Sequence, residues 1–431
     1  MIPLYSWPSA EARRRISHQD SSVLGLEQTV REIIDKVRDE GDKALLEFTA
    51  ELDGADLSES GLRVGEEEIE QAYSQVDKEF LSAVSQAKEN IQAFHMKQKP
   101  RDWFTQDPKG SIVGQVYRPL ERVGIYVPGG TANYPSSVLM TSVPARVAGV
   151  AELVMVSPPD KQGRLPAATL VAAKEAGVEE IYKIGGAQAV AALAYGTETI
   201  RPVDKIVGPG NIYVTLAKKQ VFGTVGIDML AGPSEIMIVG DGSVEASYAA
   251  ADLLSQAEHD KRARAFLVTP NMLWAKKVQE TIQELMEELP RSIIAKRALE
   301  EAGAIIITKN LEEAFLIANE TAPEHISLLF DDPWPQLVKV KNAGAVFLGP
   351  YSPESLGDYW AGPNHVLPTG GAARYASALS VDDFYKRSSI INYTKNGLAE
   401  ASEGICRLAA KEMLDGHGYA VNIRTQKAGR E

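Results

Sequence analysis

The feature that most constrains this fold is a regular alternation of short apolar runs and helical segments, which starts near residue 111. The runs RVGIYVPGG, AELVMVSPP and EIYKIGG each end in Gly or Pro, and a segment with helical spacing follows each of them. A second series starts at SEIMIVGDG and continues through ARAFLVTP and GAIIITKN to HISLLF and GAVFLG. Strands that alternate with helices predict parallel sheets built from βαβ units.

Helical segments flank both series. Residues 25–98 carry apolar side chains at helical spacing, as in VREIIDKV and FLSAVSQAKENI, and the chain from about residue 376 is also predicted to be mostly helical. A chain of 431 residues exceeds what one ordinary core supports, so two or three domains are expected. The predicted fold class is therefore α/β, with two incomplete Rossmann-like domains, a helical N-terminal segment and a helical C-terminal tail.

Charge and composition exclude several classes of function. The 45 Lys and Arg against 58 Asp and Glu give a formal charge of −13, and the cations form no long cluster, which disfavours nucleic-acid binding. No apolar stretch reaches the roughly 20 residues of a membrane span, and the N-terminus lacks the apolar core of a signal peptide. We therefore predict a cytoplasmic protein.

The cysteine content sets a further limit. Cys406 is the single cysteine, so an intrachain disulfide and a cysteine-based zinc site are both excluded. It lies in GICRLAAKEML, which is predicted to be an amphipathic helix without an adjoining His, Lys or Gly-rich turn. This context favours a small buried side chain over a nucleophile.

Glycine-rich turns at three strand ends indicate a ligand. The Rossmann fingerprint G-x-G-x-x-G is absent, and the turns are Gly129–Gly130, Gly185–Gly186 and Gly208–Asn211. In a parallel sheet these ends share one edge, where helix N-termini direct amides at an anion. A phosphate-bearing ligand fits this edge, although each glycine alone is explained by its turn.

Four of the six histidines lie in compact polar motifs: QAEHD, APEHIS, GDYWAGPNH and DGHGYA. Gln256 and His259 are three residues apart on a predicted helix and share a face. Nitrogen and oxygen ligands without sulfur suit zinc or another divalent ion, while the alternative is a set of structural hydrogen-bond donors. Glu324 and His325 are adjacent, which favours acid–base work over joint chelation, or else a salt bridge at a strand start.

Longer motifs carry a family resemblance. The stretches GPGNIYVTLAKKQV, DMLAGPSEIMIVGD, ADLLSQAEHD, APEHISL and GAVFLGPYSPESLGDYWAGPNHVLPT resemble the histidinol dehydrogenase family, and the resemblance runs from about residue 25 to about residue 420. It implies a zinc-dependent homodimer with one Zn²⁺ per subunit. Such an enzyme oxidises L-histidinol to L-histidinal and then to L-histidine, with two NAD⁺ consumed.

The resemblance also implies a role for individual residues. Glu324 and His325 would form the catalytic acid–base pair. Substrate contacts would come from Ser234, His365 and Glu412, together with His325 and the metal ligands. The implied zinc ligands are Gln256, His259, Asp358 and His417. The implied NAD-binding residues are Tyr126, Gln188 and Asn211.

The same resemblance implies a domain-swapped dimer, in which Glu412 and His417 complete the site of the other subunit. The expected organisation has an N-terminal arm (1–24) and a larger α/β domain (25–115 plus 234–375). A Rossmann-like domain (116–233) is inserted into that larger domain, and a helical tail (376–431) contacts the partner.

Two alternatives remain at this stage. A relative with the same zinc and acid–base set could oxidise another small polar alcohol, such as a sulfonated diol, for which Arg or Lys would be expected near the substrate. A zinc hydrolase or a non-enzymatic nucleotide-binding protein belongs to a different class. Formation of NADH from histidinol, and its loss with a chelator, separates all three.

Overall fold

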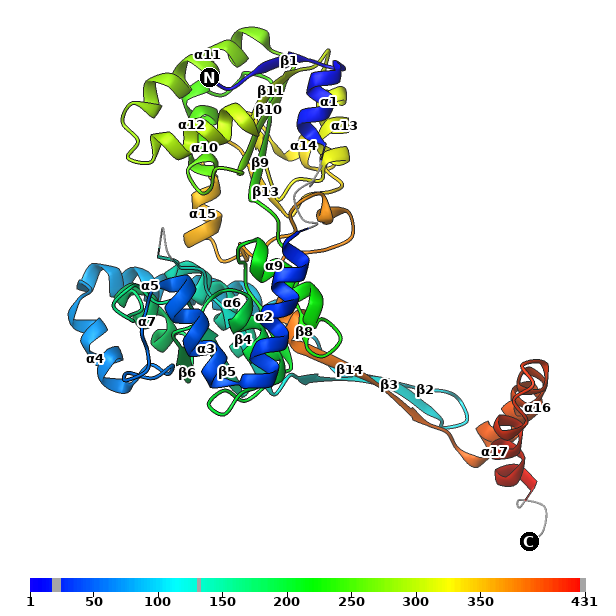
Figure 1. Ribbon diagram of the computed structural model, residues 1–431. Helices are drawn as coiled ribbons and strands as arrows, with labels where there is room; N and C mark the ends of the chain where they lie inside the picture. The colour runs from blue at the N-terminus through cyan, green and yellow to red at the C-terminus, as the bar shows by residue number, and fades with distance from the viewer. Residues whose placement is uncertain (18–24, 130–132, 427–431) are drawn as a thin grey trace. The chain divides into compact units, whose positions relative to one another are not determined.

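The computed structural model describes residues 1–17, 25–129 and 133–426, and it divides into two compact units (Figure 1). Unit 1 comprises residues 1–98 and 120–384 and holds two parallel sheets. Unit 2 comprises residues 99–119 and 385–431. Residues 18–24 of the predicted N-terminal arm, and Gly130 of the first glycine turn, lie outside the described residues.

The first sheet of unit 1 has five parallel strands in the order β6-β5-β4-β7-β8. Successive strands step outward from β4 to one side and then return to its other side, so the order reverses between β4 and β7. Ligands bind at such a reversal in open α/β sheets. The strands are β4 (Arg122–Tyr126), β5 (Glu152–Val156), β6 (Glu180–Tyr182), β7 (Lys205–Val207) and β8 (Gly226–Ile227).

Helices cover both faces of this sheet, because right-handed crossovers that run in opposite directions from β4 place their helices on opposite faces. Apolar residues from the sheet and from α2, α3, α8 and α9 form one continuous buried cluster. The crossover helices are α6 (Pro135–Ala148), α7 (Ala167–Glu175), α8 (Gly186–Tyr195) and α9 (Ile212–Val221). The helices that precede the sheet are α2 (Leu26–Glu40), α3 (Asp42–Phe48), α4 (Glu66–Ser74) and α5 (Lys78–Met96), with a π-helical turn at Thr49–Asp53.

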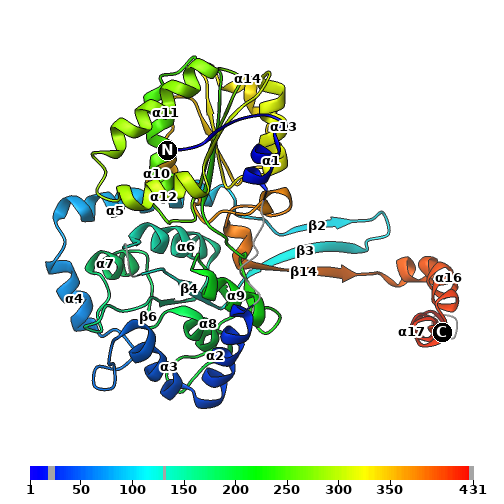
Figure 2. The ribbon, with the colours of Figure 1, turned by 45° about the horizontal axis from the view of Figure 1, so that its top comes forward.

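The second sheet of unit 1 has six parallel strands in the order β1-β11-β10-β9-β12-β13. Its two faces bury separate apolar clusters, one against α10, α11 and α12 and the other against α13 (Figure 2). The strands are β1 (Leu4–Ser6), β9 (Glu235–Gly240), β10 (Arg264–Thr269), β11 (Ala304–Ile307), β12 (His325–Leu329) and β13 (Ala345–Leu348). The helices are α1 (Ala10–Ile16), α10 (Ala246–Ala257), α11 (Met272–Met286), α12 (Ser292–Glu301), α13 (Leu311–Thr321), α14 (Trp334–Leu337) and α15 (Glu354–Tyr359).

Unit 2 is an antiparallel ribbon followed by two helices. Its strands are β2 (Trp103–Gln106), β3 (Ile112–Pro119) and β14 (Tyr385–Asn392), and β3 pairs with both of the others. The helices α16 (Lys395–Lys411) and α17 (Asp415–Gln426) pack on each other.

The α/β class with parallel sheets is confirmed, as are the helices within residues 25–98. The region predicted to be mostly helical from residue 376 differs, because β14 occupies residues 385–392. Its partner β3 is far away in the sequence, so no local pattern announces the pairing. Among the described residues, no helix combines the length and the apolar character that a membrane crossing requires.

Candidate active site

The candidate active site lies at the amino edge of the six-stranded sheet. Glu324 directly precedes β12, and His325 is the first residue of that strand, paired in register with Ile236 of β9. Helix α10 runs from the carboxyl end of β9 back to this edge, so its last turn carries Gln256 there and His259 follows. At the opposite edge, the indole of Trp274 packs closely on Gly240, where an added Cβ would lie 2.7 Å from it.

The backbone of Glu235 holds the predicted acid–base pair in place. Its N–H donates to Oε2 of Glu324 at 2.9 Å, and its carbonyl oxygen lies 3.2 Å from Nδ1 of His325. A carbonyl can only accept, so Nδ1 carries the proton and Nε2 keeps its lone pair. Nε2 is buried and has no hydrogen-bond partner among the described residues. His325 therefore presents an unused acceptor, as a general base requires.

Burial sets the protonation of this pair. It lowers the pKa of His325 to about 4, although the carboxylate of Asp358 acts in the opposite direction. Burial also raises the pKa of Glu324 well above its ordinary value, and the charges of Glu235 and Glu354 add to the effect. His325 is consequently neutral at pH 7 and able to accept a proton.

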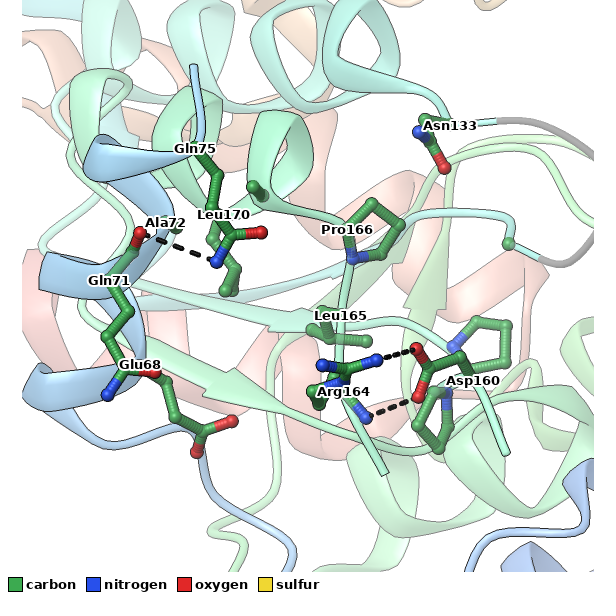
Figure 3. A pocket seen from close by; sticks show the side chains of 14 residues that line it. Glu68, Gln71, Ala72, Gln75, Asn133, Asp160, Arg164, Leu165, Pro166 and Leu170 are labelled. Atoms are coloured by element: carbon green, nitrogen blue, oxygen red, sulfur yellow. Dashed lines mark hydrogen bonds and ion pairs between the residues drawn. The ribbon is translucent and has the colours of Figure 1, made fainter. Parts of the chain in front are cut away.

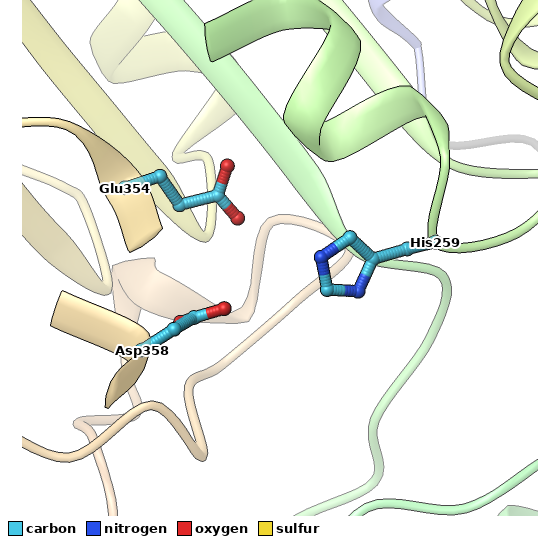
Figure 4. A group of neighbouring side chains, drawn as sticks. All are labelled: His259, Glu354 and Asp358. Atoms are coloured by element: carbon cyan, nitrogen blue, oxygen red, sulfur yellow. The ribbon is translucent and has the colours of Figure 1, made fainter. Parts of the chain in front are cut away.

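A cluster of nitrogen and oxygen donors lies beside this pair. Helix α15 presents Glu354 and Asp358, four residues apart, on one face. Their carboxylates and the imidazole of His259 point toward one another, with ligand atoms all within 4.8 Å (Figure 4). Such a sulfur-free donor set suits zinc or another divalent ion.

The amide of Gln256 supports the same interpretation. The side chain is fully buried, yet neither its oxygen nor its nitrogen has a hydrogen-bond partner within the described part of the chain. A buried amide without partners is costly unless a ligand satisfies it. The side chains at this edge therefore fit a divalent cation.

Glu354 is a member of the cluster that the sequence reasoning missed. Burial raises its pKa, and the nearby charges of Asp358 and Asp252 raise it further. One oxygen lies 3.7 Å from Nδ1 of His325, and the other, Oε2, has no partner among the residues described. The available signal was its spacing of four from Asp358, which becomes informative only if SPESLGDYW is taken as a helical turn.

A cavity of about 480 Å³ opens at this site and is lined by His325, Asp358 and His365 together with apolar residues such as Phe347 and Leu367. His365 has a partner on each ring nitrogen. Nδ1 lies 3.1 Å from the carbonyl oxygen of Asp358, and Nε2 lies 3.3 Å from the hydroxyl of Ser137. Burial lowers the pKa of His365, so it is neutral at pH 7.

Of the remaining predicted residues, Ser234 lies at the same edge of the sheet, whereas Glu412 and His417 lie in unit 2. Ser234 directly precedes β9, and its carbonyl accepts the amide of Arg264 at 3.0 Å. Glu412 ends α16 and His417 lies on α17, so both belong to unit 2, and both are exposed. Cys406 is half-buried in α16, where its thiol lies 3.4 Å from Oδ1 of Asn422.

A second cavity, of about 840 Å³, lies at the carboxyl edge of the five-stranded sheet and is lined by Tyr126, Gln188 and Asn211. The hydroxyl of Tyr126 accepts the Gly186 amide at 3.0 Å, and Asn211 caps α9. At Gly208, φ is +110° and an added Cβ would lie 2.2 Å from the Tyr126 carbonyl oxygen. Only glycine permits this close approach of β4 and the end of β7.

Two such cavities are typical of an oxidoreductase. The cavity at the five-stranded sheet suits a nucleotide cofactor, and the cavity at the six-stranded sheet suits a substrate beside the base His325. The histidinol dehydrogenase family model matches residues 16–425. Histidinol dehydrogenases from Heliobacterium mobile and Moorella thermoacetica are 51% and 54% identical to this chain, and each alignment covers 99% of the chain and 100% of the relative. A crystal structure of histidinol dehydrogenase from Elizabethkingia anophelis superposes with a TM-score of 0.94 at 36% identity, covering 99% of this chain and 98% of that one.

The chain therefore belongs to the histidinol dehydrogenase family. This membership makes it an enzyme, an NAD-dependent oxidoreductase of histidine biosynthesis, as the sequence predicted.

Proposed function

We propose that this chain oxidises L-histidinol to L-histidine through L-histidinal, in two NAD-linked steps at a zinc site, as a cytoplasmic homodimer. The observation that carries the proposal is the arrangement around His325. Its Nδ1 is occupied by the carbonyl of Glu235, whereas its buried Nε2 has no partner among the described residues. A base of this kind beside a cation-binding cluster suits the oxidation of an alcohol.

For the metal, we propose that Gln256, His259 and Asp358 hold one zinc ion together with His417. Glu354 lies close enough to be a further ligand or to bind a group of the substrate. The bound zinc would supply a Lewis acid that holds the amino and imidazole nitrogens of histidinol. The buried, unpartnered amide of Gln256 supports this assignment.

In the first oxidation, His325 would remove the proton of the alcohol through Nε2, while the carbinol carbon loses hydride. Tyr126, Gln188 and Asn211 would hold the NAD⁺, whose chemistry when bound is to accept that hydride. The lowered pKa of His325 keeps the imidazole neutral before the step.

In the second oxidation, Glu324 would activate water that adds to the aldehyde, and the resulting diol would lose the second hydride. Burial raises the pKa of Glu324, which makes its carboxylate a stronger base toward water than an ordinary glutamate. A thiohemiacetal on Cys406 is the competing route, but that thiol lies in α16 beside Asn422.

The proposed substrate contacts are His365, Ser234 and Glu412. The lining of the 480 Å³ cavity includes no Lys or Arg among the described residues. A sulfonate would need such a cation, whereas Asp358, the acidic side chain in that lining, favours a cationic amine. This charge pattern supports histidinol over a sulfonated alcohol.

For the dimer, we propose that unit 2 of one subunit binds the other, so that Glu412 and His417 complete the partner's site. Unit 2 exposes several large apolar side chains, which a partner subunit would cover. The exposed fractions are 49% for Trp103, 56% for Phe104, 74% for Ile391, 69% for Leu408 and 86% for Met413.

The deciding experiment measures NADH absorbance with L-histidinol as the substrate. We expect about two NADH per histidinol, and we expect L-histidine as the product. A chelator should abolish the reaction, and added Zn²⁺ should restore it. NADH formation without histidine, or full activity in the metal-free protein, contradicts the proposal.

A further inference from the structure

The cavity at the carboxyl edge of the five-stranded sheet contains an acidic residue to which no role has been given. Asp53 ends the π-helical turn Thr49–Asp53, and it lines the cavity together with Tyr126 and Gln188. Gly54 follows in the left-handed region at φ +71°, which ends the turn and fixes where the Asp53 side chain begins.

The carboxylate of Asp53 is partly buried and has an open acceptor. Its Oδ2 is buried and lacks a hydrogen-bond partner among the described residues. Burial raises the pKa of Asp53 to about 6. Burial also raises the pKa of Tyr126, and the charge of Asp53 adds to that effect. Asp53 therefore lies near the tyrosine that we assign to the cofactor. Oε1 of Gln188 is a second buried acceptor without a partner in the described part of the chain.

In nucleotide-binding sheets, the acid that binds a ribose usually follows the second strand. The second strand here is β5, and the acid after it is Asp160. Its Oδ1 accepts the amides of Gln162 and Arg164, both at 2.9 Å. Figure 3 shows the contacts with Arg164, whose guanidinium lies 3.5 Å from Oδ2 of Asp160. The carboxylate of Asp160 is thus already engaged by its own loop, whereas Asp53 offers the cavity an oxygen without a partner among the described residues.

Resting on the proposed NAD site, we propose that Asp53 binds the 2′-hydroxyl of the adenosine ribose of NAD and excludes the 2′-phosphate of NADP. An ionised carboxylate accepts hydrogen bonds from hydroxyls and repels a phosphate. Lys161 is the single cation among the described residues that line this cavity. Its Cγ lies 3.7 Å from a Cβ placed on Gly54, so its stem runs beside the Asp53 turn.

The test measures the binding of NAD, NADP and 2′-deoxy-NAD by calorimetry, without substrate. Asp53→Asn should weaken NAD binding about 10-fold, the size of one charged hydrogen bond. It should also strengthen NADP binding, because Lys161 then meets the phosphate without a competing carboxylate. Asp53→Asn combined with Lys161→Gln should lose that gain. The wild type should bind 2′-deoxy-NAD about 10-fold more weakly than NAD, and Asp53→Asn should bind the two alike.

Glu51→Gln is the matched control, because Glu51 is exposed on the same turn and lies outside the cavity lining. It should leave all three affinities unchanged. Asn at position 53 nearly preserves the shape of Asp, and thermal unfolding verifies that the variant is folded. The inference is overturned if Asp53→Asn binds NAD normally, or if it loses NAD and NADP to the same extent. If the wild type itself binds no NAD, the proposed function fails as well. If the wild type binds NAD and only the expected effects of Asp53→Asn are missing, the inference about Asp53 alone fails.

Discussion

The hydroxyl of Ser137 on α6 lies 3.3 Å from Nε2 of His365, so the five-stranded-sheet part of unit 1 directly contacts the candidate substrate site. Nδ1 of His365 lies 3.1 Å from the carbonyl oxygen of Asp358 and must carry the proton, because that oxygen can only accept. Nε2 then accepts from Ser137. The helix that follows β4 consequently orients a histidine that we assign to the substrate.

Ser137→Ala should remove one of the two partners of His365. We expect KM for histidinol to rise roughly 3- to 10-fold, which corresponds to one neutral hydrogen bond, with kcat nearly unchanged. Steady-state kinetics measure both constants. Ser136→Ala is the control, because Ser136 has no hydrogen bond to His365 among the described residues. A fall in kcat with KM unchanged would show that Ser137 does more than position the ring.

Glu324→Gln should impair the oxidation of L-histidinal more than the oxidation of L-histidinol. The substitution keeps the size of the side chain but removes a carboxylate able to take a proton from water. The aldehyde step should therefore slow by about 10² or more. Single-turnover measurements with each substrate separate the two steps. Equal losses in both steps would argue against water activation by Glu324.

Cys406→Ser completes that comparison. If the aldehyde reacts through water, this variant should retain near-full turnover, since the thiol hydrogen-bonds to Gly418 and Asn422 of its own helical hairpin in unit 2. Selective loss of the aldehyde step in Cys406→Ser would instead favour a thiohemiacetal.

Glu354→Gln should weaken metal retention about 10-fold, because one carboxylate of the donor cluster becomes a poorer ligand or a poorer partner of the ligands. The readout is metal content after dialysis against a graded series of chelator concentrations. Glu258→Gln, next to His259 but outside the cluster, should retain metal as the wild type does. Unchanged retention in Glu354→Gln would place this carboxylate with the substrate rather than the metal.

Acid should destabilise the protein through Glu180. The guanidinium of Arg122 at 2.9 and 3.0 Å lowers the pKa of this carboxyl from 4.5 to about 2. Between pH 4.5 and 2 the unfolded chain binds the extra proton, so this contribution to stability is complete above pH 4.5 and is lost as the pH falls. Urea unfolding at pH 5 and pH 3 should show a smaller difference in Glu180→Gln than in the wild type.

Glu70→Gln provides the control for this effect. Glu70 is an exposed residue of α4, and its substitution makes the same change in net charge. It should leave the pH dependence of unfolding as in the wild type. A Glu70→Gln effect as large as that of Glu180→Gln would point to net charge rather than to the Arg122 pair.

The sequence predicted the βαβ series well, because each buried strand is an apolar run closed by Gly or Pro, as at β4 and β9. It also singled out His259 and Asp358, which lie about 100 residues apart in the sequence and come together in the folded chain. Strand β14 could not be predicted from the sequence, because its pairing with β3 is entirely non-local. Asp53 gave no signal either, since nothing in FTAELDGAD marks a residue whose carboxylate enters a cavity.

The ladder between β3 and β14 has a consequence for the order of folding. Pro119 pairs with Tyr385, so the whole of segment 120–384 forms a loop that must close before this ladder can begin. Closing so long a loop in an unfolded chain costs entropy, whereas a folded unit 1 already brings residues 120 and 384 together through the hydrogen bond from Leu120 N to Phe384 O. The pairing of β14 with β3 should therefore form last, starting at Tyr385 and proceeding toward Asn392. A chain arrested before that stage would have both sheets of unit 1 and the donor cluster of His259, Glu354 and Asp358, but not the paired β3 and β14 of unit 2.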